Sequence, residues 1–216
     1  MVTNRNIDQV IRTLKQLVRQ WQVPIVTQYR HDAFTTLISC LLSLRTRDET
    51  TAGASIRLFR LARTPKRLLA LSTRQIERAI YPVSFYRVKA RTLRRVCETL
   101  LERWGGKVPD DLDELLTIPG VGRKTANLVV TLAFRKDGIC VDTHVHRISN
   151  RWGYVQTKTP EDTEMMLRRK LPRRYWRIYN DLLVAFGQNL CHPTSPWCSR
   201  CPVERVCAKV GVTRSR

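Results

Sequence analysis

The chain has 216 residues, of which 43% are hydrophobic, and its 39 Lys and Arg against 18 Asp and Glu give a formal net charge of +21. This length and apolar content can bury one large core or two small ones, and no apolar run is long enough to span a bilayer, which excludes a membrane-spanning protein. Ribosomal proteins and some thermostable surfaces are also strongly basic. Here the basic residues are spread through helical segments, which favours a folded nucleic-acid-binding surface over a basic arm.

The N-terminal segment predicts a structural helix. Its apolar residues trace one helix face: Ile7, Val10, Ile11, Leu14, Leu17, Val18 and Trp21. The segment has neither an apolar signal core nor a small-residue cleavage site. Its arginines resemble those of an organelle presequence, but the continuous apolar face favours a helix that packs on a core.

Helical segments then follow one another along the chain. Residues 32–44 are nearly all apolar and predict a buried helix capped by Asp32, and residues 48–62 predict a helix capped by Asp48. The second helix has apolar residues at Ala54, Ile56, Leu58, Phe59 and Leu61. Short helices near 65–71 and 73–80 lead to a turn, YPVSFY, and an Arg-rich amphipathic helix over 86–104.

The segment IPGVGRKTAN at 118–127 comes after a short helix over 112–116. It is not a phosphate-binding Walker A loop, because Lys124 follows Arg123 instead of glycine and the preceding element is helical. The pattern predicts a helix, a tight turn with two glycines and a second helix over 125–134. Such a turn exposes backbone N–H groups that suit a DNA phosphate without reading sequence, the alternative being an ordinary helical hairpin.

Lys124 and Asp142 are the candidate chemical groups. The default interpretation of a lysine here is a phosphate contact or a solvated charge. A helix N-terminus disfavours a cation, however, so the amine of Lys124 is more easily neutral and can act as a nucleophile that forms a Schiff base. A carboxylate would then be needed beside it, and Asp142 precedes the next helix, in ICVDTHVHR.

The last third predicts helices near 143–152, 161–170 and 173–187, so the class is all-α with very little strand. The seven cysteines divide into three isolated ones, read as core residues, and four near the end: Cys191, Cys198, Cys201 and Cys207. An odd number without export signals indicates a reducing compartment and a metal site over disulfides. Four thiolates suit either zinc or an iron–sulfur cluster.

Four motifs give the chain a family resemblance. They are LLSLRTRD at 41–48, KVPDDLDELLTIPGVGRKTAN at 107–127, VDTHVHRISNR at 141–151 and the four cysteines spaced x6, x2 and x5. In this order they resemble the helix-hairpin-helix DNA glycosylases and, among them, endonuclease III. The resemblance extends from about residue 10 to 210.

The resemblance implies a two-lobed fold. One lobe would be a six-helix barrel over 26–136 that contains the hairpin at about 112–134, and the other would join 1–25 to 137–216 and carry an iron–sulfur loop. In that family the lysine of GVGRKTA attacks the sugar and the aspartate of VDTH assists, which assigns these roles to Lys124 and Asp142. The four cysteines match the family's [4Fe–4S] ligands, with a structural role expected for the cluster.

The resemblance also implies a set of DNA contacts. These are Arg45, Phe85, Gly120, Val121, Gly122, Arg123, His144 and Arg147. Relatives often have glutamine where Arg45 would fill the gap left by a flipped base, so damage selectivity is expected to differ. Phe85 would be an apolar wedge, the alternative being a core aromatic. For His144 and His146 we expect hydrogen bonds at the helix start and phosphate contact, in preference to a metal-binding or general-base role. For some of the basic residues over 87–95, which are arginines and Lys89, we expect phosphate contact.

The implied function is base excision repair. A bifunctional glycosylase would remove oxidised pyrimidines from duplex DNA and cleave the abasic strand by β-elimination through a lysine Schiff base. The alternatives are a monofunctional adenine or mismatched-thymine glycosylase, which usually has another residue in place of Lys124, and a non-catalytic DNA-binding module. The expected partner is double-stranded DNA with damaged or abasic sites, bound by a monomer without membrane association. The expected location is the cytoplasm of a bacterium or archaeon, or the nucleus or an organelle of a eukaryote.

Overall fold

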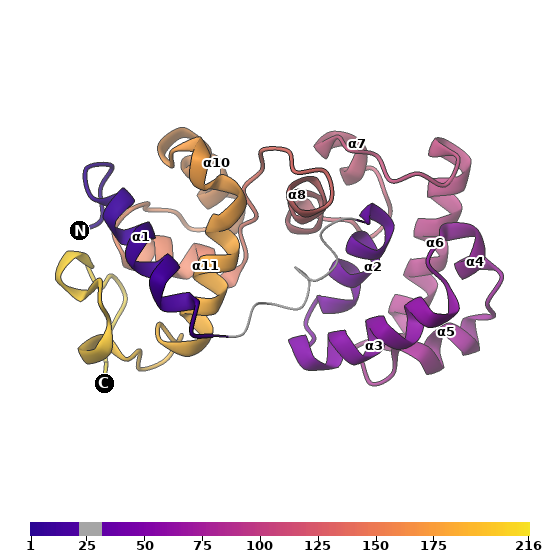
Figure 1. The fold of residues 1–216 in the computed structure, drawn as a ribbon, viewed down its shortest axis with the longest axis horizontal. Helices are drawn as coiled ribbons and strands as arrows, with labels where there is room; N and C mark the ends of the chain where they lie inside the picture. Colours follow the sequence, from indigo (N-terminus) through magenta and orange to yellow (C-terminus); the bar gives the residue numbers. More distant parts are fainter. Residues whose placement is uncertain (22–31) are drawn as a thin grey trace. The chain divides into compact units, whose positions relative to one another are not determined.

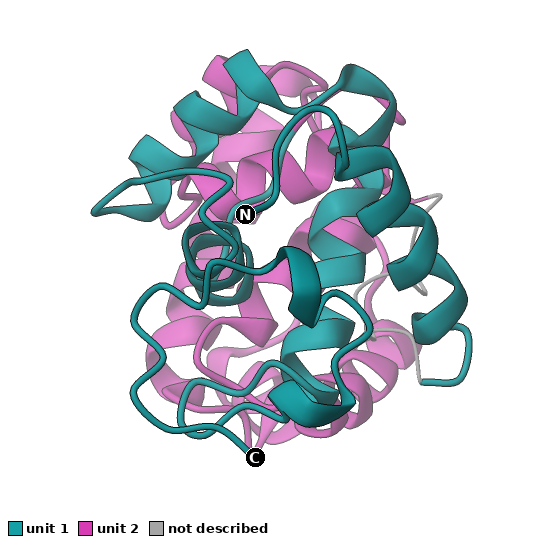
Figure 2. Ribbon diagram, turned by 90° about the vertical axis from the view of Figure 1, so that its left-hand side faces the viewer, with its two compact units in different colours: residues 1–24, 139–216 teal, residues 25–138 magenta. Residues whose placement is uncertain are grey.

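The computed structural model describes residues 1–21 and 32–216, and its helices are shown in Figure 1. The chain forms two compact units, one of Met1–Pro24 with Ile139–Arg216 and one of Ile25–Gly138 (Figure 2). The predicted domain junction between residues 25 and 26 lies outside the described residues. Over the described ranges every regular element is a helix, which confirms the predicted all-α class.

The unit of Ile25–Gly138, called the hairpin unit below, is built around one apolar core. Its helices are α2 (Ala33–Ser43), α3 (Asp48–Leu61), α4 (Pro65–Leu69), α5 (Thr73–Ile80), α6 (Tyr86–Trp104), α7 (Leu112–Leu116) and α8 (Arg123–Leu132). Helix α2 is buried along nearly its whole length and packs on α3, α6 and α8. As predicted, Asp32 caps it, because its carboxylate accepts hydrogen bonds from the backbone N–H groups of Phe34 and Thr35.

One prediction for the hairpin unit was wrong. Arg47, not Asp48, occupies the N-cap position of α3, and Asp48 is the first helical residue. Two apolar residues of this helix, Ile56 and Leu61, are 49% and 52% exposed and lie outside its buried stripe. That stripe consists of Thr51, Ala54, Ser55, Leu58 and Phe59.

The other unit, called the cysteine unit below, has a core of its own. Its elements are α1 (Ile7–Val18), α9 (Thr143–Arg151), α10 (Pro160–Lys170), the 3-10 helix η2 (Arg173–Tyr175), α11 (Trp176–Asn189) and the short 3-10 helices η3 (Cys198–Arg200) and η4 (Glu204–Val206). As predicted, α1 buries one face, formed by Ile7, Val10, Ile11 and Leu14. Helix α11 packs on both α1 and α9.

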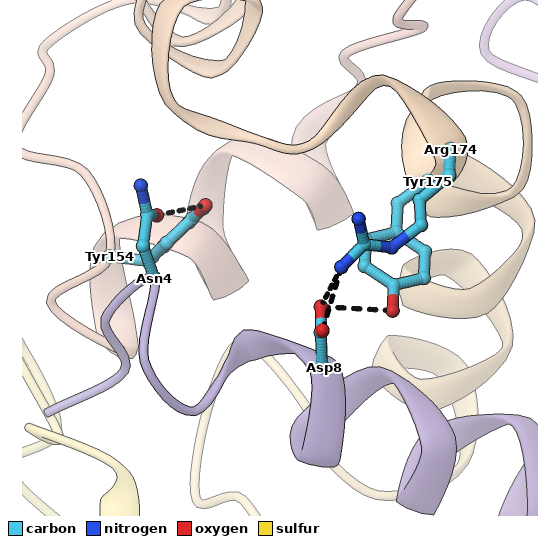
Figure 3. A network of polar contacts seen from close by, with 5 residues as sticks. All are labelled: Asn4, Asp8, Tyr154, Arg174 and Tyr175. Atoms are coloured by element: carbon cyan, nitrogen blue, oxygen red, sulfur yellow. Dashed lines mark hydrogen bonds and ion pairs between the residues drawn. The ribbon is translucent and has the colours of Figure 1, made fainter.

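Polar contacts fix the N-terminal segment inside the cysteine unit (Figure 3). The Arg174 guanidinium lies 2.6 and 2.7 Å from the two carboxylate oxygens of Asp8, and the Tyr175 hydroxyl donates to Asp8 at 3.0 Å. The Tyr154 hydroxyl donates to Asn4 at 2.9 Å. These contacts join segments that are far apart in the sequence, and Val2 and Ile7 of the same N-terminal segment are buried in this unit's core.

Candidate active site and DNA-contact residues

The hairpin predicted at IPGVGRKTAN is present between α7 and α8. Asp111 caps α7, and the chain then turns through a backbone hydrogen bond from Val121 N–H to the Ile118 carbonyl oxygen, 3.0 Å long. Helix α8 begins at Arg123 and ends at Leu132, so the predicted range of 125–134 started and ended two residues too late. The early start places Arg123 and Lys124 in the first turn of the helix.

The two glycines of the turn have different reasons to be glycine. Gly120 has a φ of +83°, and a Cβ there would lie 2.7 Å from Cγ2 of Thr92, so the protein itself requires glycine. Gly122 has ordinary extended backbone, is exposed and would place a Cβ in open space. Its lack of a side chain therefore serves no packing within the described residues, and it leaves the N-terminus of α8 accessible.

Lys124 is the second residue of α8 and is half-buried. It lies near enough to Cys40 of α2 to act on it electrostatically. Burial raises the pKa of the Cys40 thiol to about 12, and the positive charge of Lys124 acts in the opposite direction. Lys124 lies at the N-terminus of α8, the positive end of the helix dipole.

Arg45 and Phe85 are both exposed on the hairpin unit. Arg45 follows the end of α2 and Phe85 is the N-cap residue of α6. The alternative that Phe85 is a core aromatic is wrong, because its side chain is 62% exposed. Phosphate contact by Lys89 and Arg94 is not supported either, since both side chains bond to backbone carbonyls of their own unit.

Asp142, in the cysteine unit, is the N-cap residue of α9. Its Oδ1 atom accepts hydrogen bonds from the backbone N–H groups of His144 and Val145, both 2.9 Å long. The residue is half-buried. This geometry fixes the carboxylate at the start of the helix, so its position does not depend on side-chain freedom.

His144 and Arg147 contact each other one turn apart on α9. Nη2 of Arg147 donates to Nδ1 of His144 at 3.2 Å and to the backbone oxygen of Cys191 at 2.9 Å. Because arginine has donors only, Nδ1 of His144 is the acceptor and the ring proton resides on Nε2. Gly187 of α11 makes room for both side chains, since a Cβ there would lie 2.3 Å from Nδ1 of His144.

His146 points into a different polar group. Its Nδ1 lies 2.7 Å from the Thr163 hydroxyl, which is itself 2.6 Å from the Thr157 hydroxyl. This hydrogen bond agrees with the hydrogen-bonding role expected for His146.

The four C-terminal cysteines line one cavity of the cysteine unit. Its apolar walls include Trp152, Phe186, Leu190, Pro196, Trp197 and Val212. Burial raises the pKa of the Cys201 thiol to about 12, and the charges of the other three cysteines act in the same direction, so all four sulfurs are near one another. A site of this kind disfavours bare thiolates and suits a bound cationic group.

The donor set fits a metal centre bound by thiolates. Four cysteines line one cavity, and four thiolates are the ligands both of structural zinc and of iron–sulfur clusters. Arg151, which the sequence reasoning did not single out, supports the loop. It is 6% exposed and donates to Sγ of Cys191 at 3.3 Å and to the carbonyl oxygen of His192 at 2.8 Å.

Comparisons with known proteins agree with this arrangement. A family profile described as HhH-GPD superfamily base excision DNA repair protein matches residues 38–173. Endonuclease III of Thermotoga maritima is 47% identical over 176 residues, which cover 82% of this chain and 83% of that protein. Endonuclease III-like protein 1 of Mus musculus is 42% identical over 174 residues, covering 79% of this chain and 58% of that longer protein.

Solved structures of DNA glycosylases have a similar fold. A trapped endonuclease III–DNA covalent intermediate matches with a TM-score of 0.87 and 33% identity, covering 97% of each chain. A thermostable thymine-DNA glycosylase matches with a TM-score of 0.82 at 23% identity, which speaks for the fold alone. The predicted helix-hairpin-helix glycosylase fold is confirmed. None of the described helices is long and apolar enough to cross a membrane.

Proposed function

The chain belongs to the endonuclease III group of the HhH-GPD superfamily of base excision DNA repair proteins and is a DNA glycosylase with AP lyase activity, and from this premise we propose that Lys124 and Asp142 carry out its chemistry. Lys124 is the nucleophile and Asp142 the carboxylate. We further propose double-stranded DNA with oxidised pyrimidines or abasic sites as the substrate, bound by a monomer. The enzyme would act where the cell keeps its DNA: the bacterial or archaeal cytoplasm, or a eukaryotic nucleus or organelle.

The proposed reaction begins with a nucleotide turned out of the duplex, at a cost of a few kcal/mol that is lowest for damaged bases. The Lys124 nitrogen bonds to C1′ as the bond to the base breaks, and the base leaves with the bonding electrons and takes up a proton. The carboxylate of Asp142 stabilises the positive charge that develops on the sugar. The nitrogen then loses a proton and the sugar ring opens to a Schiff base. Removal of a 2′ proton expels the 3′ phosphate, which cleaves the strand on the 3′ side. Water then hydrolyses the Schiff base, which frees Lys124 and leaves the unsaturated sugar on the 3′ end.

The observation that carries this proposal is the position of Lys124. A lysine in the first turn of α8 directly follows a glycine turn whose exposed Gly122 has no packing reason to lack a side chain. The N-terminus of α8 and the turn amides suit a phosphate, which would place the amine beside the neighbouring sugar. Monofunctional relatives have no need of an amine there.

We propose that the contacts to DNA are made by Arg45, Phe85, Gly120, Val121, Gly122, Arg123, His144 and Arg147. Val121 is 6% exposed, so its contact would be through the backbone. Arg147 is half-buried and bonded to Cys191, so its contribution would be mainly to orient His144. The net charge of +21 supplies the general attraction to the DNA backbone.

We propose that the domain of residues 1–25 and 137–216 holds a [4Fe–4S] cluster, with Cys191, Cys198, Cys201 and Cys207 as its ligands. We propose that residues 26–136 form the barrel domain, which binds the DNA backbone through the hairpin. When bound, the cluster would cross-link the C-terminal loop and neutralise the four thiolates. The chain's own contribution is the apolar lining of the cavity and Arg151, which fixes the first cysteine.

The experiment uses duplex DNA with one oxidised pyrimidine and a matched undamaged duplex. The proposal predicts release of the damaged base and strand cleavage that leaves an unsaturated sugar on the 3′ end, with no cleavage of the undamaged control. Base release without cleavage until alkali is added would indicate the monofunctional alternative. Binding without base release would indicate the non-catalytic alternative.

A further inference from the structure

Two exposed residues of the hairpin unit have an unusual backbone conformation. Arg45, just after the end of α2, has a φ of 54°, and Phe85, just before α6, has a φ of 57°. Residues other than glycine rarely adopt this left-handed conformation, which costs free energy and persists only where the surrounding structure fixes it. Both residues must therefore be held in place by their neighbours.

Lys89 connects the two turns. It lies one helical turn after Phe85, to whose carbonyl its backbone N–H bonds at 2.9 Å. Its ammonium group donates to the carbonyl oxygens of Leu42 at 2.7 Å and Leu44 at 2.6 Å and to the Thr46 hydroxyl at 3.1 Å. These oxygens are at the C-terminal end of α2, where the helix dipole favours a cation. Burial lowers the pKa of Lys89 to about 8, so at pH 7 the group is still mainly protonated.

Thr46 completes the connection through its hydroxyl group. The hydroxyl oxygen accepts a hydrogen bond from the backbone N–H of Ser84 at 3.2 Å, and Ser84 directly precedes Phe85. The backbone N–H of Thr46 donates to the Ser43 carbonyl at 3.0 Å. The turn that bears Arg45 and the turn that bears Phe85 are thus bonded to each other as well as to the same lysine.

We propose that Lys89 and Thr46 are positioning residues that hold Arg45 and Phe85 as one preset pair, so that both side chains enter the duplex together when a nucleotide is turned out. This inference rests on the proposed glycosylase function. Ordering two separate turns at the moment of binding would cost conformational entropy, and a preset pair avoids that cost. Lys89 and Thr46 need not touch DNA for this role.

The test is a double-mutant cycle on nucleotide extrusion. The probe is a duplex with one abasic site opposite 2-aminopurine, whose fluorescence rises when it unstacks. The extrusion equilibrium is measured for the wild type, Arg45→Ala, Phe85→Ala and the double variant, and again with Lys89→Met in all four. In the four proteins that retain Lys89, we expect the effects of Arg45→Ala and Phe85→Ala on the extrusion equilibrium to be coupled by at least about threefold. In the four that also carry Lys89→Met, we expect the two effects to be independent within about 1.5-fold. Unchanged coupling in the Lys89→Met set would overturn the proposal.

Three further variants separate the role of Lys89 from its charge and from folding. Arg91→Met removes an equal charge from an exposed position of the same helix, and we expect the coupling to remain, even where affinity falls. Loss of coupling in Arg91→Met would contradict the proposal. Thr46→Val keeps the side-chain shape and should lower the coupling as Lys89→Met does, which decides the matter if Lys89→Met does not fold. Lys89→Arg should retain part of the coupling that Lys89→Met loses.

A second readout distinguishes this inference from the proposed function. Borohydride trapping on single-stranded abasic DNA needs no nucleotide extrusion. We expect Lys89→Met to lower the rate of base release from duplex DNA at least about tenfold more than it lowers the rate of this trapping. The reason is that Arg45 and Phe85 have to enter the base stack only in duplex DNA. If the wild type neither releases base nor traps, the proposed function is wrong. If the wild type does both and the two losses in Lys89→Met are equal, only the positioning role is wrong.

Discussion

The Oδ1 atom of Asp142 accepts a hydrogen bond from the backbone N–H of His144 at 2.9 Å. The residue that we propose as the catalytic carboxylate is therefore also the N-cap of α9. A substitution of Asp142 changes two properties at once, the negative charge and the helix cap, and the choice of variant can separate them.

We expect Asp142→Asn to keep the cap and lose the catalysis. Asparagine caps helices about as well as aspartate, so the free energy of unfolding should change by less than about 0.5 kcal/mol, and affinity for DNA should be retained. Base release should fall by about 10²-fold or more, because the charge that assists it is gone. Asp142→Ala should lose about 1 kcal/mol of stability in addition. A fall in DNA affinity that accounts for the whole loss of activity would contradict a catalytic role.

Gly187→Ala should disturb the packing of α9 on α11. The added Cβ would lie 2.3 Å from Nδ1 of His144 and 2.9 Å from Nη2 of Arg147, neither of which can be accommodated without a shift. Overpacking of this kind costs about 1–3 kcal/mol, which thermal or urea denaturation would measure. The double variant Gly187→Ala with His144→Ala removes the nearer obstacle and should recover part of the stability. Equal stability of Gly187→Ala and the wild type would show that the contact is wrong.

The cysteine site predicts a coloured protein. A [4Fe–4S] cluster bound by thiolates absorbs at about 400 nm, so the purified protein should be brown and contain about four iron atoms per chain. Cys198→Ser should lose most of that absorbance and lower the midpoint of thermal unfolding. Cys97→Ala, which changes a buried cysteine of the hairpin unit, should keep it. A colourless protein that contains zinc would refute the cluster.

Asp8 should stabilise the fold in a pH-dependent way. Hydrogen bonds from Arg174 and then Tyr175 lower the pKa of the Asp8 carboxyl below its ordinary value of 3.8. Because the folded state binds the proton more weakly than the unfolded state, the stabilisation is present above pH 3.8 and is lost as the pH falls through the lowered pKa. Denaturation curves should therefore show Asp8→Asn less stable than the wild type at pH 7, with the difference shrinking below pH 3.8. Arg174→Met should abolish most of that pH dependence.

Local sequence rules predicted the helical parts of this protein and missed contacts made at long range. The buried run of α2 and its cap Asp32 follow from neighbouring residues, whereas the N-cap of α3 is Arg47, one residue before the aspartate that the sequence favours. Lys89 resembled its basic neighbours in the sequence. Its position against α2 is set by carbonyl oxygens more than 40 positions earlier, for which the sequence has no signal.

The glycine hairpin was predictable for a different reason. Its geometry needs a fixed residue type at a fixed position, because only glycine at position 120 tolerates both the positive φ and the approach of Thr92. The exposure of side chains was harder to predict, because a phenylalanine at position 85 is compatible with both a core position and a surface position. In the structure Phe85 adopts left-handed backbone just before α6 and is exposed.

The most direct test of the central claim is borohydride reduction of the enzyme on duplex DNA that contains an oxidised pyrimidine. We expect a covalent protein–DNA adduct, and peptide mapping by mass spectrometry should place the modification on Lys124. Lys124→Ala should give no adduct and keep its affinity for DNA, whereas Lys136→Ala, a lysine beyond α8 that pairs with Asp110, should still form the adduct. A wild-type enzyme that releases the base but never traps, or an adduct mapped to another residue, would contradict the account.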